Sequence, residues 1–461
     1  MPNKLANIDS PSPKLHKDKR NSFRFILHWF NIISVSFLVL WVVIGNFAAF
    51  QLEQPVLVAK AELVRQFPKI ETNASALKLE ELRAKLGINM LIAQNRNDDL
   101  YVPTETSKIK FNQIDGDLWR YLEDSTSSVP SKSLQQYLST QSENLATIRS
   151  HILKSDIPRW ETFDVNMKIG KSAMTSENSF RVTTLHGILI ADAINNSRLG
   201  NPKAAIDSLE SSWRLNQSVK ERPNLLSQFV ANITDGVQVR GLRKLDLASP
   251  VWQKRLISFD QSKSFLTALK FDIFEQYGIT RNFPLRKGGS EQDEQSSSIL
   301  SRILQPFVQP YFTLSAVDTW QVAMRELDLR FNQDPCISIS YEDMPKLSSW
   351  NILGALGSSS FGLQVYKLTK RQIDMELTQK ILRLREVASQ SGKFPQTLSG
   401  IDSSVICKNL RYVYQPSADG EAMTISLSKQ NRPEWLVERE GDIPLSYTTK
   451  LRKLQKLTES Q

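Results

Sequence analysis

A long apolar stretch, FRFILHWFNIISVSFLVLWVVIGNFAAFQL, covers residues 23–52 near the N-terminus. From Phe25 to Leu52, 28 consecutive residues include no Asp, Glu, Lys or Arg. A helix needs about 20 apolar residues to cross a hydrocarbon core of about 30 Å, so this run can span a bilayer with room for tilt. We predict a transmembrane anchor over residues 25–50, preceded by a basic tail over residues 1–24.

A cleaved signal peptide is the alternative interpretation of the same stretch. The hydrophobic region of a signal peptide is usually only about 7 to 15 residues long, which is shorter than this run. Ala59-Lys60-Ala61 fits a small-x-small cleavage pattern, but it lies well beyond the apolar residues. The length favours an uncleaved anchor.

The charges that flank the anchor predict its orientation. The first 24 residues carry a net charge of +4, from two acidic residues and six basic ones: Lys4, Lys14, Lys17, Lys19, Arg20 and Arg24. Short segments rich in Lys and Arg stay on the cytoplasmic side of a membrane. We therefore expect a single-pass protein of the bacterial inner membrane, with its N-terminus in the cytoplasm and the residues after Gln54 in the periplasm.

The predicted exported part has the composition of a folded, mildly basic body. Apolar residues make up 40% of the chain, and the net charge of +10 includes the +4 of the N-terminal tail. The remaining excess favours contact with anionic lipid or envelope polymer. We expect the lipid bilayer and envelope proteins as partners, and no nucleic acid.

Helical periodicity dominates a predicted domain over residues 56–283. Leucines at steps of three and four residues predict a helix over residues 76–86 that ends at Gly87. Further helices are predicted over residues 134–153, 223–245 and 260–277.

A helical hairpin is predicted within this domain, over residues 180–199 and 203–219, with Gly200-Asn201-Pro202 as its turn. The small and large residues of its second helix have the spacing of one tetratricopeptide-like repeat. No second copy is present, and such repeats need about three units to bury a continuous face. Two interpretations stay open, an ordinary core hairpin and a peptide-binding array, and the missing copies favour the first.

Residues 284–298, PLRKGGSEQDEQSSS, have the Gly, Ser and charge content of a flexible loop. A second helical region is predicted beyond it, over residues 299–391. One face of its first helix carries a stripe at steps of three and four residues, typical of core packing: Val317, Trp320, Met324, Leu327 and Phe331. The uncharged stretch between Lys346 and Lys367 is too rich in Gly and Ser for a second membrane span, so we predict a surface loop that leads into a helix.

A small module with a β-hairpin is predicted over residues 392–440. Apolar residues alternate on both sides of Asp419-Gly420, a strong turn signal. The order of a helix, the sequence SGKFPQTL at residues 391–398 and an antiparallel hairpin resembles the C-terminal half of type II secretion pseudopilins. That resemblance implies only a local fold, because the prepilin-peptidase site and the calcium-loop acids of the family are not evident here.

The larger arrangement is similar to that of single-pass bacterial envelope proteins, a group without a known activity. An N-terminal anchor, a helical body with GNPKAAIDSL and LTQKILRLR, and a closing Gly-Lys-Phe-Pro module carry this likeness. It implies a location and an architecture. The fold class we predict is mainly α, with an N-terminal transmembrane helix, a multi-helix exported body and a small C-terminal α+β module.

The two cysteines, Cys336 and Cys407, both lie in the predicted exported part, where an oxidising compartment would permit a disulfide. Such a bond would close a loop of about 70 residues and contribute about 4 kcal/mol in the chain-entropy model. Two buried thiols are the alternative.

Motifs that would indicate catalysis are sparse. His151 and His186 are the only histidines of the predicted exported part, and no metal-ligand spacing accompanies them. Ser75-Ala76-Leu77-Lys78 fits a Ser-x-x-Lys pattern but lacks companion motifs, so we expect Ser75 to cap a helix. Asp115-Gly116-Asp117 could hold a metal in a glycosyltransferase, but alternating strands and helices are missing around it, and we expect Asp117 to cap a helix that begins at Leu118. No catalytic residue, metal or cofactor is predicted.

The tail over residues 441–461 ends in a basic, amphipathic segment. Leucines three residues apart alternate there with the basic residues Lys450, Arg452, Lys453 and Lys456. A helix that packs on its own body and a helix that docks on anionic lipid or an acidic partner are both open.

These patterns favour a membrane-anchored scaffold or adaptor of the cell envelope that is not evidently catalytic. The alternative is a membrane-tethered enzyme that acts on envelope polymer. A third interpretation, a eukaryotic type II membrane protein, would use glycosylation sequons at Asn73, Asn195, Asn216 and Asn232, but three of these lie in predicted helices.

Overall fold

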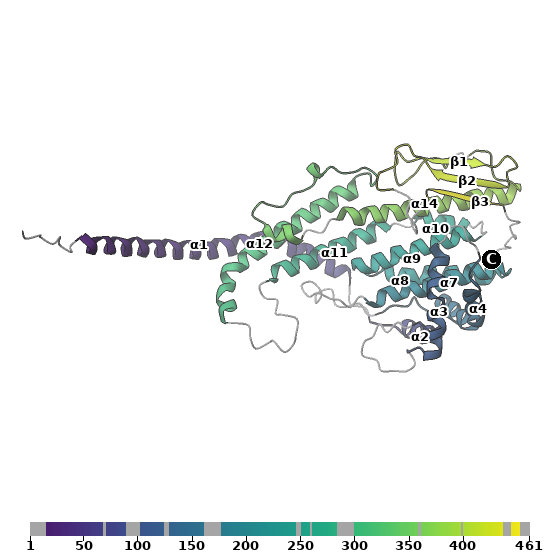
Figure 1. Cartoon of the computed structure of the whole chain (residues 1–461), viewed down its shortest axis with the longest axis horizontal. Helices are drawn as coiled ribbons and strands as arrows, with labels where there is room; N and C mark the ends of the chain where they lie inside the picture. Colours follow the sequence, from purple (N-terminus) through teal and green to yellow (C-terminus); the bar gives the residue numbers. More distant parts are fainter. Residues whose placement is uncertain are drawn as a thin grey trace, which may run out of the picture.

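The computed structural model describes residues 15–67, 71–88, 102–123, 129–160, 177–245, 250–258, 261–283, 299–357, 361–397, 400–436 and 444–451. They form a mainly helical body, with a small antiparallel sheet near one end and a long helix, α1, that projects from the other (Figure 1). The predicted mainly helical class is confirmed, with its long apolar N-terminal helix and its small C-terminal sheet. The predicted loop over residues 284–298 lies outside the described residues.

Helix α1, Leu15–Gln66, is much longer than the predicted anchor. Among the described helices it is the one that is long and apolar enough to cross a membrane, with a mean hydropathy of 2.3 over 18 residues. Pro55 lies inside the helix without ending it. A proline there removes one backbone hydrogen bond, and the burial of Val56 and Leu63 against α11 and α12 offsets that cost. The apolar run therefore continues into the body without a linker.

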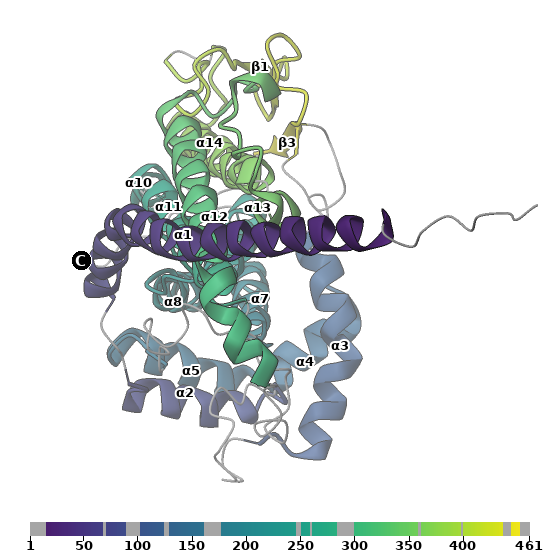
Figure 2. The same cartoon turned by 90° about the vertical axis from the view of Figure 1, so that its left-hand side faces the viewer.

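Helices α2 to α10 surround the largest apolar core, with α2 to α5 on the side of the body away from the sheet (Figures 1 and 2). Their bounds are α2 Ala74–Ala84, α3 Glu105–Glu123, α4 Lys132–Thr140, α5 Ser142–Lys154, α7 Glu177–Arg198, α8 Pro202–Lys220, α9 Leu225–Lys244 and α10 Pro250–Ser258. The helix predicted over residues 134–153 is divided at Gln141 into α4 and α5. Helix α10 was not predicted.

The predicted hairpin is formed by α7 and α8. Gly200 has φ +77°, the left-handed conformation that glycine adopts without strain. Pro202 follows as the first residue of α8, where its missing N–H costs no helical hydrogen bond. Both helices bury apolar residues in the same core as α9, as an ordinary core hairpin does.

The second helical region contains α11 Gln261–Arg281, α12 Ile299–Asn332, α13 Ile352–Gly357 and α14 Phe361–Ser391. The stripe predicted on α12 is confirmed as packing, since Val317 and Leu327 are buried and the three other residues are partly buried against the same clusters. The uncharged stretch before Lys367 forms a loop, the short α13 and the beginning of α14.

Helix α14 is buried on almost every side, because it lies between the helical body and the sheet (Figure 1). Met375 and Leu382 belong to the large helical core, whereas Ile381 and Leu384 pack under the sheet. A helix that is enclosed in this way needs internal partners for its polar side chains.

The sheet has three antiparallel strands in the order β1-β2-β3: β1 Tyr412–Pro416, β2 Ala422–Leu427 and β3 Ser446–Lys450. Gly420, with φ +73°, lies in the β1–β2 turn as predicted. The third strand corrects the prediction of a basic amphipathic helix that includes residues 448–450. Thr448 and Lys450 pair with Thr424 and Ala422 of β2, because the edge of a two-stranded hairpin offers free backbone groups.

Candidate functional site

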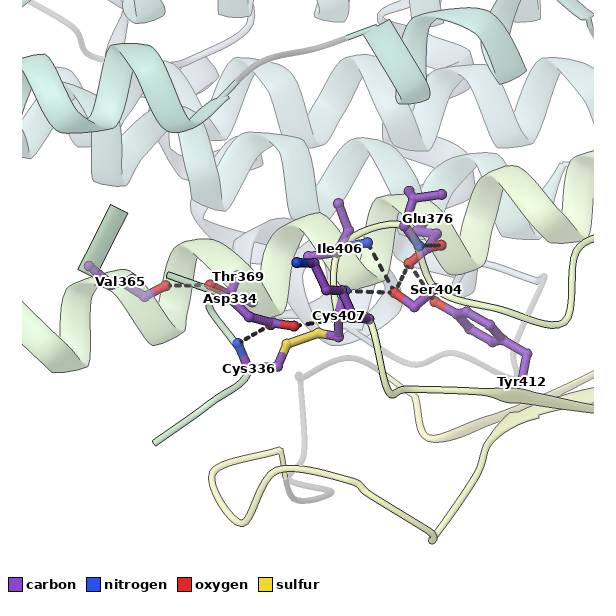
Figure 3. Close-up of a disulfide and its surroundings, with 11 residues drawn as sticks. Asp334, Cys336, Val365, Thr369, Glu376, Ser404, Ile406, Cys407 and Tyr412 are labelled. Carbon is purple, nitrogen blue, oxygen red and sulfur yellow. Dashed lines mark hydrogen bonds between the residues drawn. A yellow bond between two sulfur atoms is a disulfide. The ribbon is translucent and has the colours of Figure 1, made fainter. Parts of the chain in front are cut away.

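Cys336 and Cys407 form a disulfide, with their Cα atoms 5.5 Å apart (Figure 3). The bond joins the segment after α12 to the loop that precedes β1. The carboxylate of Asp334 supports both sides of it, since it accepts hydrogen bonds from the backbone N–H of Cys336 at 2.9 Å and of Lys408 at 3.2 Å. The sequence left open a disulfide or two buried thiols, and this geometry is that of the disulfide.

Glu376 of α14 binds the same loop (Figure 3). Its carboxylate accepts hydrogen bonds from the Ser404 hydroxyl at 2.6 Å, from the Val405 N–H at 2.8 Å and from the Tyr412 hydroxyl at 3.1 Å. Burial and the adjacent Glu376 raise the pKa of Tyr412 well above its ordinary value, so the phenol stays protonated and donates. Sequence reasoning missed this cluster, because its members come from separate elements.

The two segments that the disulfide joins both expose apolar side chains to solvent. Ile337 is 55% exposed, Tyr341 84% and Val405 81%. We call these three residues the disulfide surface. Apolar residues that a rigid segment leaves exposed are candidates for a protein contact.

Three buried ion pairs connect the helices of the body: Arg149–Asp192, Lys220–Asp235 and Arg243–Asp374. Asp374 also pairs with Arg371 at 2.7 Å. Burial raises the pKa of Asp374, but the guanidinium groups of Arg243 and Arg371 lower it more, so it lies below its ordinary value. Each carboxylate has its own cation and lies inside the helix packing, as in a structural ion pair.

Lys220 and Asp235 are both buried, and their charged groups lie 2.7 Å apart. Burial raises the pKa of Asp235 and lowers that of Lys220, because each charge loses its hydration. Asn216 also donates to the Asp235 carboxylate, at 2.8 Å. One of the predicted glycosylation sequons is therefore part of the core, and its amide has no room for a sugar in the folded chain.

Ser75 lies inside α2, whose N-cap is Asn73, so the prediction that Ser75 caps the helix is wrong. The Asn73 side chain accepts a hydrogen bond from the Ala76 N–H at 2.9 Å, and the helix therefore begins before Ser75. Lys78 pairs with Glu81 at 2.6 Å. The amine of the Ser-x-x-Lys pattern thus binds a surface carboxylate.

A contact that the sequence did not predict joins Ser75 to His151 of α5, with Oγ and Nε2 3.2 Å apart. The same Nε2 lies 2.9 Å from the carbonyl oxygen of Ser75, and the Ser75 hydroxyl donates to the Asp156 carbonyl at 2.7 Å. A nitrogen that donates to a carbonyl cannot also accept the hydroxyl proton as a general base. The cluster connects the beginning of α2 to the end of α5.

His186 is fully buried on α7, and its Nδ1 lies 3.1 Å from the Ser212 hydroxyl of α8. Burial, with a further contribution from Lys220, lowers its pKa to about 3. The imidazole is therefore neutral at physiological pH. His186 is therefore a packed histidine of the helical core.

Asp117 lies in the interior of α3, so the prediction that it begins a helix is wrong. Its carboxylate accepts hydrogen bonds from Ser131 at 2.8 Å and Ser133 at 2.6 Å, which holds the beginning of α4. These two hydroxyl contacts lower the pKa of Asp117. Among the described residues, no group of three or more His, Cys, Asp or Glu side chains could hold a metal ion.

A further polar cluster lies where α1 meets the body. Glu53 of α1 is buried, and it accepts hydrogen bonds from the Tyr277 hydroxyl and the Arg281 guanidinium of α11.

Of the predicted basic contact residues, Lys450 is exposed on β3. Arg452, Lys453 and Lys456 lie outside the described residues.

Comparison with protein-family models, with curated proteins and with solved structures finds no match. The resemblances to pseudopilins and to envelope proteins therefore stay predictions.

Proposed function

We propose that the protein is a membrane-anchored scaffold or adaptor of the bacterial cell envelope. Its N-terminus lies in the cytoplasm, α1 crosses the inner membrane, and the helical body stands in the periplasm and binds envelope proteins. The observation that carries this proposal is the continuity of α1, which runs from the apolar stretch into the core of the body.

A continuous helix gives the body a defined position relative to the membrane. Val56 and Leu63 of α1 are buried, and Glu53 is bound by α11. The body therefore cannot rotate freely on its anchor, as it could on a Gly-rich linker. A rigid platform of this kind holds a binding surface at a constant height, which suits a scaffold.

The disulfide supports the periplasmic location. Disulfides persist in oxidising compartments and are rare in the cytoplasm. Cys336 and Cys407 lie on the C-terminal side of α1, in agreement with the orientation that the basic N-terminal tail predicts.

The disulfide surface is the proposed contact with an envelope protein. Ile337, Tyr341 and Val405 are exposed, while the segments that carry them are held by the disulfide and by Glu376. A preordered loop loses little conformational entropy on binding. The surface is therefore suited to a partner that offers an apolar patch of its own.

In-cell photocrosslinking tests this contact. p-Benzoylphenylalanine would replace Val405 in one chain and Val413 in a matched control, an exposed apolar residue on β1. We expect Val405 to give one discrete adduct with an envelope protein, absent from the control and lost when Ile337→Asp is added. Identical adducts at both positions would refute the proposed contact.

The basic C-terminal residues need a separate deletion. A deletion from Thr448 onward would remove paired residues of β3, whereas a deletion of residues 452–461 leaves the strand complete. If Arg452, Lys453 and Lys456 contribute to a partner contact, the shorter deletion reduces the Val405 adduct while the disulfide still forms. An unchanged adduct would exclude these residues from the contact.

A further inference from the structure

An aromatic collar lies beside the place where α1 meets the body. We define the collar as Phe283, Phe307, Tyr311, Phe312 and Trp350. Phe283 stacks on Phe312 with ring centroids 5.6 Å apart, and Tyr311 contacts Trp350 edge-on at 6.2 Å. The collar thus joins the end of α11, the first half of α12 and the loop before α13.

The collar is attached directly to the apolar run of α1. The indole N–H of Trp41 donates to the backbone carbonyl of Phe307 at 2.9 Å. A Cβ atom at Gly45 would lie 2.9 Å from Cβ of Pro310, so this close approach of α1 and α12 requires a glycine. An indole N–H in a bilayer has no water to bond, and here α12 supplies its acceptor.

The position of these contacts along α1 indicates how deep in the membrane the collar would lie. If the hydrocarbon core begins near Phe25, Trp41 lies about 24 Å along the helix and Gly45 about 30 Å, at a rise of 1.5 Å per residue. The core of a bilayer is about 30 Å thick. Phe307 and Pro310 therefore lie at the level where the hydrocarbon core meets the headgroups of the outer leaflet.

The first turns of α12 have the orientation of an interfacial helix. In both views they run across the direction of α1, at the end of the body from which α1 projects (Figures 1 and 2). A helix that runs roughly perpendicular to a membrane-spanning helix lies along the membrane surface. Pro306 and Pro310 lie inside α12, and prolines bend a helix at such a turn.

The collar exposes apolar side chains instead of covering them. Phe283 is 56% exposed, Trp350 45% and Phe307 36%, and Leu304 and Ile352 beside them are exposed as well. The side chains of Phe47 and Phe50, on the adjoining turns of α1, are exposed as well. Trp and other amphipathic rings are enriched at the membrane interface.

We propose that the aromatic collar and the first turns of α12 are inserted in the outer leaflet, where phospholipid acyl chains cover their exposed side chains. This inference rests on the proposed anchoring by α1 and adds a second membrane contact made by the body itself. The two contacts together would prevent the body from tilting on its anchor.

Lipid photocrosslinking tests the insertion. The full chain, with p-benzoylphenylalanine at Phe307 or Trp350, would be reconstituted in vesicles of phosphatidylethanolamine and phosphatidylglycerol that contain an alkyne-tagged phospholipid. Val39 of α1 is the positive control and Val413 of β1, at the other end of the body, is the negative control. The Cys336–Cys407 disulfide, read from mobility without reductant, verifies that each variant is folded.

We expect lipid adducts at Phe307 and Trp350 about tenfold above those at Val413 and similar to those at Val39. Adducts at Val39 alone would refute the insertion and leave the anchor intact, as would adducts to a second copy of the chain at Phe307. A Val39 variant without lipid adducts would overturn the anchoring itself, and with it the proposed function.

Discussion

Asp374 is enclosed by Arg243 and Arg371 at the contact between α9 and α14. Asp374→Asn would leave the buried guanidinium of Arg243 and the partly buried one of Arg371 without this carboxylate, and we expect a loss of about 3–5 kcal/mol in the free energy of unfolding. Urea denaturation followed by circular dichroism measures this loss.

Asp402→Asn is the matched control, because the Asp402–Arg411 pair is exposed on both sides at 3.6 Å. Exposed pairs contribute about 0–1 kcal/mol. Equal effects of the two substitutions would contradict a structural role for the buried pair. Because the folded pKa of Asp374 is lowered, its ion pairs stabilise the folded chain above the ordinary carboxyl pKa. This stabilisation is lost as the pH falls through the lower pKa of the folded state.

His186 gives the stability of the body a pH dependence with a definite sign. Its folded pKa of about 3 lies below the value of about 6.5 expected for the unfolded chain. The unfolded state therefore binds a proton first, and stability decreases as the pH falls below about 6.5.

We expect His186 to account for a loss of about 2 kcal/mol between pH 7.5 and pH 5. His186→Asn retains a polar group for Ser212 and cannot titrate, so denaturation midpoints measured across this range should fall less in the variant. A variant with the same pH slope as the parent would exclude His186 as the cause.

At the scale of elements, glycines determine how closely helices approach. A Cβ atom at Gly241 of α9 would overlap the buried side chain of Ile190 on α7. Gly241→Ala should therefore destabilise the body by about 1–3 kcal/mol, as overpacking of a core does. Thermal denaturation of the variant and of the parent chain measures this loss.

Gly116 provides the opposite case on α3, since no atom lies within 4 Å of the position that a Cβ atom would take there. Gly116→Ala should stabilise the chain by about 0.5–1 kcal/mol, because alanine loses less backbone entropy in a helix. The opposite signs at Gly241 and Gly116 distinguish helix contact from helix propensity. A stabilising Gly241→Ala would contradict the close α7–α9 packing.

At the scale of the whole molecule, the disulfide connects two parts that are 71 residues apart in sequence. Replacing both cysteines by serine should lower the stability of the sheet module by about 4 kcal/mol in the chain-entropy model. Hydrogen exchange of β1 and β2 amides, with and without reductant, measures this change. Hydrogen exchange in the double variant should not change when reductant is added. If reductant made exchange faster in the double variant too, loss of the disulfide would not be the cause.

Local patterns in the sequence determined the elements that depend on neighbouring residues. The apolar run predicted the long apolar part of α1, the spacing around Gly200 predicted the α7–α8 turn, and Asp419-Gly420 predicted the β1–β2 turn. Each of these depends on a backbone preference or on hydropathy within a few residues. Both are readable without knowledge of the fold.

Only the tertiary structure decided how distant segments meet. Residues 446–450 join the sheet because β2 has a free edge, although the basic pattern around them resembles a helix. Pro55 stays inside α1 because the body buries the turns that follow it. Residues far apart in sequence are joined by the disulfide, by the carboxylate contacts of Glu376 and by the contact of Trp41 with Phe307 of the collar. Their energies come from burial and packing across elements, which no local pattern records.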